Sequence, residues 1–385
     1  MLHIRSVFAL LCSTTLFFSC IEDKQLKSQL PPAIVKQHVN TYAKGFKIFN
    51  HEFNTILKIK NPWPNAERSY QFLLLTKEQA ASTELKKGEF DGIIITPVEK
   101  IVVTSTTHIP ALELLGVEQT LVGFPGSDYI SSEKTRHRIE KGLVRELGKN
   151  EGINTEVLLE LQPDVVVGFG VDGTSKSLNT IKTSGIPVIY NGDWVETSPL
   201  AKAEWIKFFG VLYGKEKRAD SIFRHIETDY INAKKLALHI ENRPTVLSGA
   251  MHKDIWYLPS GTSPEAQILK DANVNYLWSD TTASGSLALS FETVYEKAKQ
   301  AEIWLSPSYY SSYDDLEKAN QHYLKFDAFQ NKMVYTFSNT TGASGGVLYY
   351  ELGMARPDLV LKDIIKVCHP KLLENYQPFF FKPLE

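Results

Sequence analysis

The feature that most constrains the fold of this chain is a long amphipathic stretch over residues 215–239. Its apolar residues recur every three or four positions, the spacing of one buried stripe on an α-helix, at Ala219, Ile222, Phe223, Ile226, Tyr230, Ala233 and Leu236. No proline or glycine interrupts the stretch, and Pro244 limits it because the residue before a proline avoids the α region. A helix of about 25 residues is roughly 37 Å long. We therefore expect a rigid helix that connects two lobes.

The sequences on the two sides of this helix contain the same short unit. Each unit has an N-cap residue, a glutamate two positions later, a short helix and then an apolar strand. The first has Asn154 and Glu156 before residues 165–167, and the second has Ser290 and Glu292 before residues 303–305. From spacing alone, both acids are explained as ordinary first-turn residues that the helix dipole favours.

Strands alternate with helices on both sides of the connecting helix, which predicts parallel sheets. The predicted fold class is α/β, with two α/β lobes, parallel central sheets, one long connecting helix and a ligand cleft between the lobes. We place a signal peptide at residues 1–20, a tether at 21–32, an extension packing on the first lobe at 33–98, the N-terminal lobe at 99–214, the interlobe helix at 215–240 and the C-terminal lobe at 241–385.

The first twenty residues have the pattern of an export signal. Arg5 precedes an apolar run of about 12 residues, which is too short to cross a bilayer core of about 30 Å. The run ends in Leu16-Phe17-Phe18-Ser19-Cys20, which resembles a bacterial lipobox. That resemblance implies cleavage before Cys20 and lipidation of its sulfur. The alternative is a plain signal peptide with an incidental cysteine.

Cysteine usage and charge exclude several classes of protein. Of the three cysteines, only Cys368 would remain unmodified after export and lipidation, so no intramolecular disulfide is expected. No Cys or His pair has the spacing of a zinc site. A formal net charge of −2 gives no electrostatic reason to expect nucleic-acid binding.

The lipobox, the two glutamate units, the connecting helix and Arg356-Pro357-Asp358 together resemble the periplasmic-type binding proteins of ABC importers. The similar class has lobes joined by one rigid helix and carries iron(III)-siderophores, haem or cobalamin. The resemblance covers roughly residues 99–370. From Glu156, the chain matches the family pattern E-x-x-x-x-L-x-P-D-x-V. In that family two equivalent glutamates dock onto arginines of the permease, so the resemblance assigns docking to Glu156 and Glu292.

The resemblance implies ligand capture and no catalysis. We expect no catalytic residue, no intrinsic cofactor and no metal held by protein side chains. The expected ligand is an iron(III)-siderophore-type chelate, with cobalamin or haem as the alternatives. Haem binders of this class often carry Gly-Tyr-x-Arg-x-Leu, whereas residues 142–147 place Leu143 at the position of the iron-ligating tyrosine. An exported hydrolase, which would need a nucleophile with a base and an orienting acid, is a remote alternative.

The resemblance also implies partners and location. We expect a monomer, exported and lipid-anchored to the cell membrane, that faces the periplasm or the outer surface and delivers its ligand to a permease dimer with ATPase subunits. Loops beyond strands of both lobes should line the cleft. The candidate ligand-binding residues are Arg145, Trp194, Trp256, Tyr257, Tyr309 and Asn339. Aromatic rings would pack on the chelate, and arginine would pair with an anionic group. For each aromatic residue, the alternative is a place in a lobe core.

Overall fold

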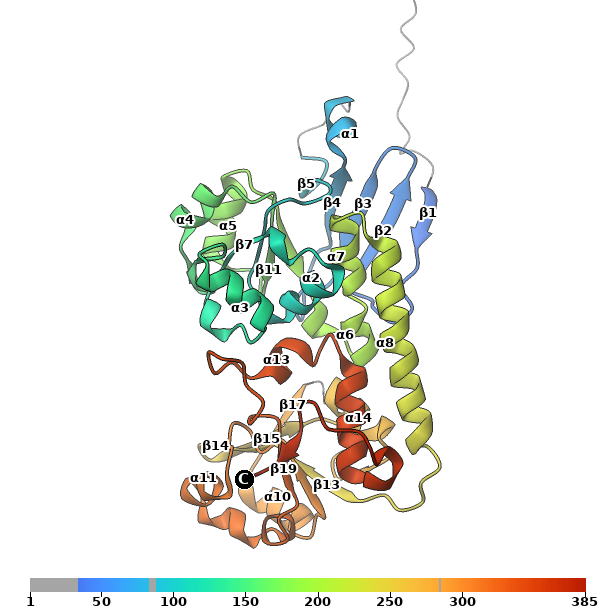
Figure 1. The fold of residues 1–385 in the computed structure, drawn as a ribbon, viewed down its shortest axis with the longest axis vertical. Coiled ribbons are helices and arrows are strands. Elements are labelled where there is room, and N and C mark those ends of the chain that lie inside the picture. The colour runs from blue at the N-terminus through green and yellow to red at the C-terminus, as the bar shows by residue number, and fades with distance from the viewer. Residues whose placement is uncertain (1–33, 83–87, 284) are drawn as a thin grey trace, which may run out of the picture.

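The computed structural model describes residues 34–82, 88–283 and 285–385. Two lobes lie end to end, and helix α8 (Glu216–Ala237) joins them along one side (Figure 1). The predicted fold class, two α/β lobes with parallel sheets joined by one long helix, is confirmed. The predicted signal peptide, the tether and Cys20 lie outside the described residues.

Helix α8 belongs to both hydrophobic cores. Its first half contributes Phe223 and Ile226 to the core of the N-terminal lobe, and its second half contributes Tyr230 and Ala233 to the core of the C-terminal lobe. One continuous stripe at helical spacing therefore fixes both lobes to the same rod. Leu236, which the sequence placed on that stripe, is instead 42% exposed near the end of the helix.

The N-terminal lobe is built on a five-stranded parallel sheet with the order β12-β11-β6-β7-β8. Its strands are β6 (Ile101–Val103), β7 (Leu121–Phe124), β8 (Arg145–Glu146), β11 (Val165–Phe169) and β12 (Val188–Asn191). A two-stranded hairpin, β9 (Gly148–Lys149) and β10 (Gly152–Ile153), follows β8. The helices of this lobe are α2 (Ile109–Leu115), α3 (Glu133–Glu140), α4 (Thr155–Leu161), α5 (Lys176–Thr183), α6 (Pro199–Ala203) and α7 (Ile206–Leu212), with short 3₁₀ turns at Thr106–His108, Glu118–Thr120, Ser127–Tyr129 and Asp193–Val195.

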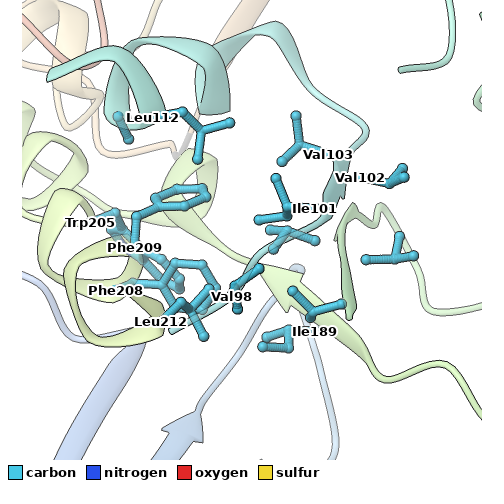
Figure 2. Close-up of a cluster of buried hydrophobic side chains, with 14 of the residues drawn as sticks. Val98, Ile101, Val102, Val103, Leu112, Ile189, Trp205, Phe208, Phe209 and Leu212 are labelled. Atoms are coloured by element: carbon cyan, nitrogen blue, oxygen red, sulfur yellow. The ribbon is translucent and has the colours of Figure 1, made fainter. Parts of the chain in front are cut away.

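The core of this lobe packs α7 against the central strands. Figure 2 shows Phe208, Phe209 and Leu212 of α7 gathered beside Val98 and Ile101. Phe208 and Ile101 are fully buried. Burying a side chain of this size stabilises the fold by roughly 1.5–3 kcal/mol relative to leaving it exposed. The apolar run that begins at Ile101 therefore forms the centre of the lobe.

A second sheet precedes this lobe and packs on it. It has the order β1-β2-β3-β4-β5, antiparallel except for the last pair. Its elements are β1 (Ile34–His38), β2 (Phe46–His51), β3 (Thr55–Ile59), β4 (Tyr70–Leu75), β5 (Gly92–Ile95) and the short helix α1 (Lys77–Ser82). One face of this sheet packs on the first lobe, and its side chains join the core of that lobe; they include Phe46, Leu57 and Phe72, one from each of β2, β3 and β4.

The C-terminal lobe carries the sheet β16-β13-β18-β19-β20, which is parallel except for β20. An antiparallel sheet, β14-β15-β17, lies beside it. The strands are β13 (Thr245–Ser248), β14 (Ala250–His252), β15 (Ile255–Pro259), β16 (Asn275–Tyr276), β17 (Ser286–Leu289), β18 (Ile303–Leu305), β19 (Val334–Thr336) and β20 (Lys382–Pro383). The helices are α9 (Pro264–Asp271), α10 (Phe291–Ala298), α11 (Tyr313–Ala319), α12 (Asp327–Gln330), α13 (Leu348–Leu352) and α14 (Pro357–Cys368), with 3₁₀ turns at Gln321–Lys325 and Pro370–Leu373.

Helix α14 packs along α8 (Figure 1). A hydrogen bond of 2.9 Å from Lys362 Nζ to Asp229 Oδ2 links the two helices. In the described part of the chain, no helix is both long and apolar enough to cross a membrane.

Candidate functional site between the lobes

Helix α13 lies between the two lobes (Figure 1). The carboxylate of Glu351 in α13 accepts hydrogen bonds from the backbone N–H groups of Ser131, at 2.6 Å, and Ser132, at 3.0 Å. The Ser344 hydroxyl donates to the carbonyl of Ile130 at 3.2 Å. These bonds attach the C-terminal lobe to a loop of the N-terminal lobe.

Glycines allow this close approach. A Cβ atom added at Gly346 would lie 2.6 Å from the carbonyl oxygen of Tyr129, and one added at Gly342 would lie 2.5 Å from that of Ser131. Contacts this short are forbidden to any other residue, so the glycine-rich run before α13 is explained by backbone packing between the lobes.

Glu351 is 3% exposed, and this burial raises its pKa to about 7 although two amides donate to it. The nearby carboxylate of Glu113 acts in the same direction. Glu113 in turn accepts hydrogen bonds from the hydroxyls of Ser132 and Thr135. The contact between the lobes therefore contains an acid that titrates close to neutral pH.

Next to this contact is a cavity of about 290 Å³ that both lobes line. We call it the interlobe cavity. The N-terminal lobe contributes residues at the carboxyl ends of its parallel strands, where α/β proteins commonly bind ligands. The lining residues are Thr104, Ser105, Thr106, Phe124, Pro125, Tyr129, Asn150 and Phe169 from this lobe, and Gly346, Val347 and Tyr350 from the other.

Aromatic and polar groups share this lining. Tyr129 is 74% exposed and Tyr350 is 43% exposed, so a phenol from each lobe is accessible. Asn150 is held in place by a 2.9 Å hydrogen bond from its Nδ2 to the carbonyl of Thr104. The cavity can therefore offer ring faces to a flat ligand and hydroxyl groups to its polar atoms.

A second cavity, of about 330 Å³, lies at the strand ends of the C-terminal lobe, and Pro199 and Lys202 of α6 also line it. We call it the C-lobe cavity. Tyr350 lines both cavities. Its ring lies 5.8 Å from the ring of Tyr309, and its pKa is raised by burial and by the hydrogen bond to Tyr309.

Three of the predicted ligand-binding residues lie beside these cavities. Tyr257 lines the C-lobe cavity, and Tyr309, which is 69% exposed, packs against Tyr350. Trp194 packs on Phe169 of the interlobe cavity, at 5.6 Å between ring centroids, and its buried Nε1 has no hydrogen-bond partner among the described residues.

The prediction that Trp256 binds the ligand needs correction, because this residue lies in the core of the C-terminal lobe. Its side chain is fully buried, stacks on Trp304 at 5.4 Å and donates a 3.0 Å hydrogen bond to the carbonyl of Ser248. Strand β15 alternates, so Trp256 points inward while the next residue, Tyr257, points outward. A ligand in either cavity does not reach Trp256.

Two other candidates line neither cavity. Arg145 is exposed on the edge strand β8. The Asn339 side chain donates a 3.0 Å hydrogen bond to the carbonyl of Ser311 and so ties together two loops of the C-terminal lobe. Leu143, at the position where related haem binders carry tyrosine, is 51% exposed and also lies away from both cavities.

Glu156 and Glu292 are exposed in the first turns of α4 and α10, one in each lobe. The preceding Asn154 and Ser290 side chains accept the capping bonds from Val157 N and Thr293 N. Since the N-cap bond is made by another side chain in both helices, neither glutamate is needed for it.

Tyr129, Tyr350 and Glu351 were not among the residues predicted from the sequence. Tyr129 lies in a polar loop beyond β7, and the other two lie well beyond the last parallel strand, β19. The pair Gly345-Gly346 just before α13 is the one sequence signal that could have pointed to them, because adjacent glycines indicate close backbone approach.

Two lobes on one connecting helix, with a cavity between them, define the class of two-lobed solute-binding proteins. Residues 101–341 match the family model of periplasmic binding proteins, so the chain belongs to that family. It is a binding protein and not an enzyme. The sequence-based resemblance to substrate-binding proteins of ABC importers is confirmed.

A curated relative and solved structures of similar fold cover most of the chain. An uncharacterised lipoprotein of Methanocaldococcus jannaschii is 26% identical over 361 residues, which cover 88% of this chain and 84% of the relative. A possible iron-binding periplasmic solute-binding protein of Staphylococcus epidermidis superposes with a TM-score of 0.57 at 18% identity and covers 71% of this chain and 100% of its own. A periplasmic haem-binding protein of Pseudomonas aeruginosa superposes with a TM-score of 0.55 at 15% identity, over 75% of this chain and 98% of its own.

Proposed function

We propose that this protein captures an iron(III)-siderophore-type chelate between its lobes and delivers it to an ABC permease. The observation that carries the proposal is the interlobe cavity, which combines exposed phenols from both lobes with hydroxyl groups at strand ends. Catecholate and hydroxamate chelates present flat faces and oxygen atoms, which such a lining can contact.

A haem ligand is the second candidate. The sequence disfavours it because Leu143 replaces the usual tyrosine, but Tyr129 and Tyr350 place two other phenols on the cavity wall. Either phenol could act as an axial ligand to ferric iron. Cobalamin remains a further alternative within the same fold.

For delivery, we propose that Glu156 and Glu292 dock onto arginines of the two permease subunits. Both side chains are exposed, one in each lobe, and their helices are capped by other residues. An exposed carboxylate that its own helix cap does not need is free to pair with a partner's guanidinium group.

We further propose that the mature chain is exported and held at the membrane by a lipid on Cys20. The lipobox-like sequence supports this, and a relative over most of the chain is a lipoprotein. Two or more acyl chains on one cysteine would give stable anchoring, where one would be marginal.

The test is a parallel titration of the purified protein with ferrioxamine B, ferric enterobactin, haemin and cyanocobalamin, followed by tryptophan fluorescence. We expect saturable binding of one ferric siderophore at one site per chain. Preference for haemin or cyanocobalamin would move the assignment to the corresponding alternative. Binding of none of the four would contradict the proposed function.

A further inference from the structure

We propose that the C-lobe cavity holds an apolar chain of the ligand, so that the captured molecule is an amphiphilic chelate with an acyl or alkyl tail. This inference rests on the proposed function, because it places the chelate itself in the interlobe cavity. It adds a second binding subsite and a chemical class of substrate.

The wall of the C-lobe cavity is mainly apolar. Leu258 of β15, Leu269 of α9, and Val360 and Ile364 of α14 line it, and each is at most 4% exposed. Phe381, from the segment before β20, adds an aromatic ring. Side chains from four separate elements therefore present hydrocarbon to one space, which favours an apolar occupant.

Small residues at the strand ends leave this space unfilled. Ser248 and Gly249 lie at the end of β13, Ser306 follows β18, and Gly353 follows α13. Gly249 cannot be larger, because a Cβ there would lie 1.9 Å from the carbonyl oxygen of Tyr257. The tight turn after β13 thus requires a residue without a side chain at the cavity wall.

Charge is nearly absent from the lining. Among the residues that the structure describes, Lys202 and Glu265 are its only charged members. Their closest N–O distance is 3.9 Å, so the two opposite charges lie next to one another in the lining. A polar chelate could replace only part of its water contacts with the few hydroxyl groups of this lining, whereas a hydrocarbon chain needs no hydrogen bonds.

The two cavities adjoin at Tyr350, which lines both. A ligand could therefore place its chelate in the interlobe cavity and pass a chain beside this ring into the C-lobe cavity. The volume of about 330 Å³ accommodates roughly ten methylene groups, if each takes about the 30 Å³ of a liquid water molecule. A chain of medium length, attached at one end of a chelate, fits this arrangement.

The experiment compares two ligands that differ only in the chain: ferrioxamine B and its N-dodecanoyl derivative. Affinities are measured by isothermal titration calorimetry with the full chain, and dodecanoic acid without chelate is the third probe. We expect the acylated chelate to bind at least tenfold more tightly than either ferrioxamine B or dodecanoic acid.

Val360 of α14 and Ile268 of α9 both line the cavity, and the variants Val360→Phe and Ile268→Phe fill it from these two elements. Both should reduce the preference for the acylated chelate to less than threefold, without weakening the binding of ferrioxamine B itself. The matched control is Val367→Phe, which is the same substitution on α14 outside the cavity lining. It should keep the full preference.

The outcomes separate the two claims. If ferrioxamine B and its acylated form bind equally well, the chain subsite is overturned while the proposed chelate binding stands. If dodecanoic acid binds and neither chelate does, both claims are overturned, and the cavity takes free fatty acids instead. If the preference survives in both filling variants, the chain does not lie in the C-lobe cavity.

Discussion

The carboxylate of Glu351 accepts a 2.6 Å hydrogen bond from the backbone N–H of Ser131, across 220 positions of sequence and between the two lobes. Together with the bond from Ser132, this bond fixes the lobes beside the interlobe cavity. A ligand that enters or leaves the interlobe cavity therefore passes beside this contact between the lobes.

Replacing Glu351 by glutamine should remove a pH dependence of lobe closure. Burial raises the pKa of Glu351 from 4.5 to about 7 in the closed arrangement, whereas an open lobe would return it toward its ordinary value. Closure then takes up a proton. Below the ordinary pKa of Glu351, the closed state has its full advantage over the open state. As the pH rises from there to about 7, the equilibrium constant for closure falls roughly tenfold for each pH unit.

The measurement is the dissociation rate of a bound ferric siderophore at pH values between about 5 and 8. The wild type should release its ligand faster as the pH rises, and Glu351→Gln should show a flat profile. Glu241→Gln, at an exposed position, is the control. An equally steep profile in the Glu351 variant would show that another group controls closure.

Replacing Glu204 by alanine should weaken the attachment of residues 41–43 to the first lobe and so lower the stability of the protein. The carboxylate of Glu204 is fully buried and accepts bonds from the backbone N–H groups of Thr41, Tyr42 and Ala43. It also accepts one from Lys207 Nζ at 2.8 Å. Removing one partner of a buried charge pair costs about 3–5 kcal/mol.

Urea denaturation measures this loss. Glu241→Ala, where the side chain is exposed, should change the free energy of unfolding by less than about 0.5 kcal/mol. A similarly small change for Glu204→Ala would mean that the segment at residues 41–43 is held by other contacts.

A proline at Ile226 should uncouple the lobes. Ile226 is 2% exposed in the middle of α8, so the substitution removes a helical hydrogen bond and a core side chain together. We expect a loss of about 3 kcal/mol or more of stability and weaker chelate binding. The measurements are thermal unfolding and calorimetric titration of this variant, with Arg224→Ala at an exposed site as the control. Unchanged stability and affinity in the Ile226 variant would contradict the role of α8.

The double variant Glu156→Ala, Glu292→Ala should bind its chelate normally but lose uptake. Breaking a partly desolvated ion pair by removing one partner costs about 2–5 kcal/mol, whereas a helix-dipole role alone is worth about 0.3–1 kcal/mol. Uptake of ⁵⁵Fe-labelled chelate by cells with matched protein levels is the measurement. The control is the double variant Glu133→Ala, Asp314→Ala, which removes an exposed first-turn acid from another helix in each lobe. Normal uptake in the variant that lacks Glu156 and Glu292 would exclude docking by these residues.

Much of the fold could be predicted from the sequence because its signals are periodic. The stripe from Ala219 to Ala233 predicts α8, and runs such as the one at Ile101 predict buried parallel strands. Trp256 could not be placed this way. It and Tyr257 are adjacent aromatic residues on one strand, and only the packing of β15 decides which of the two faces the core.

The candidate site was harder to predict because its wall comes from segments far apart in the chain. Tyr129 and Tyr350 meet at one cavity although more than 200 positions separate them. No local pattern encodes the approach of two loops from different lobes. The rule that ligands bind beyond strand ends gives the right region but not which loop extends farthest into it.

Binding of a metal chelate between the lobes can be tested by one titration with a ferric siderophore. Tyr129 and Tyr350 provide a phenol from each lobe to the interlobe cavity, and Tyr295, a half-buried tyrosine outside both cavities, supplies the control. We predict that the ferric siderophore that binds the wild type binds Tyr129→Ala, Tyr350→Ala at least tenfold more weakly, while Tyr295→Ala binds it normally. Wild-type affinity in the double variant would contradict chelate binding in the interlobe cavity.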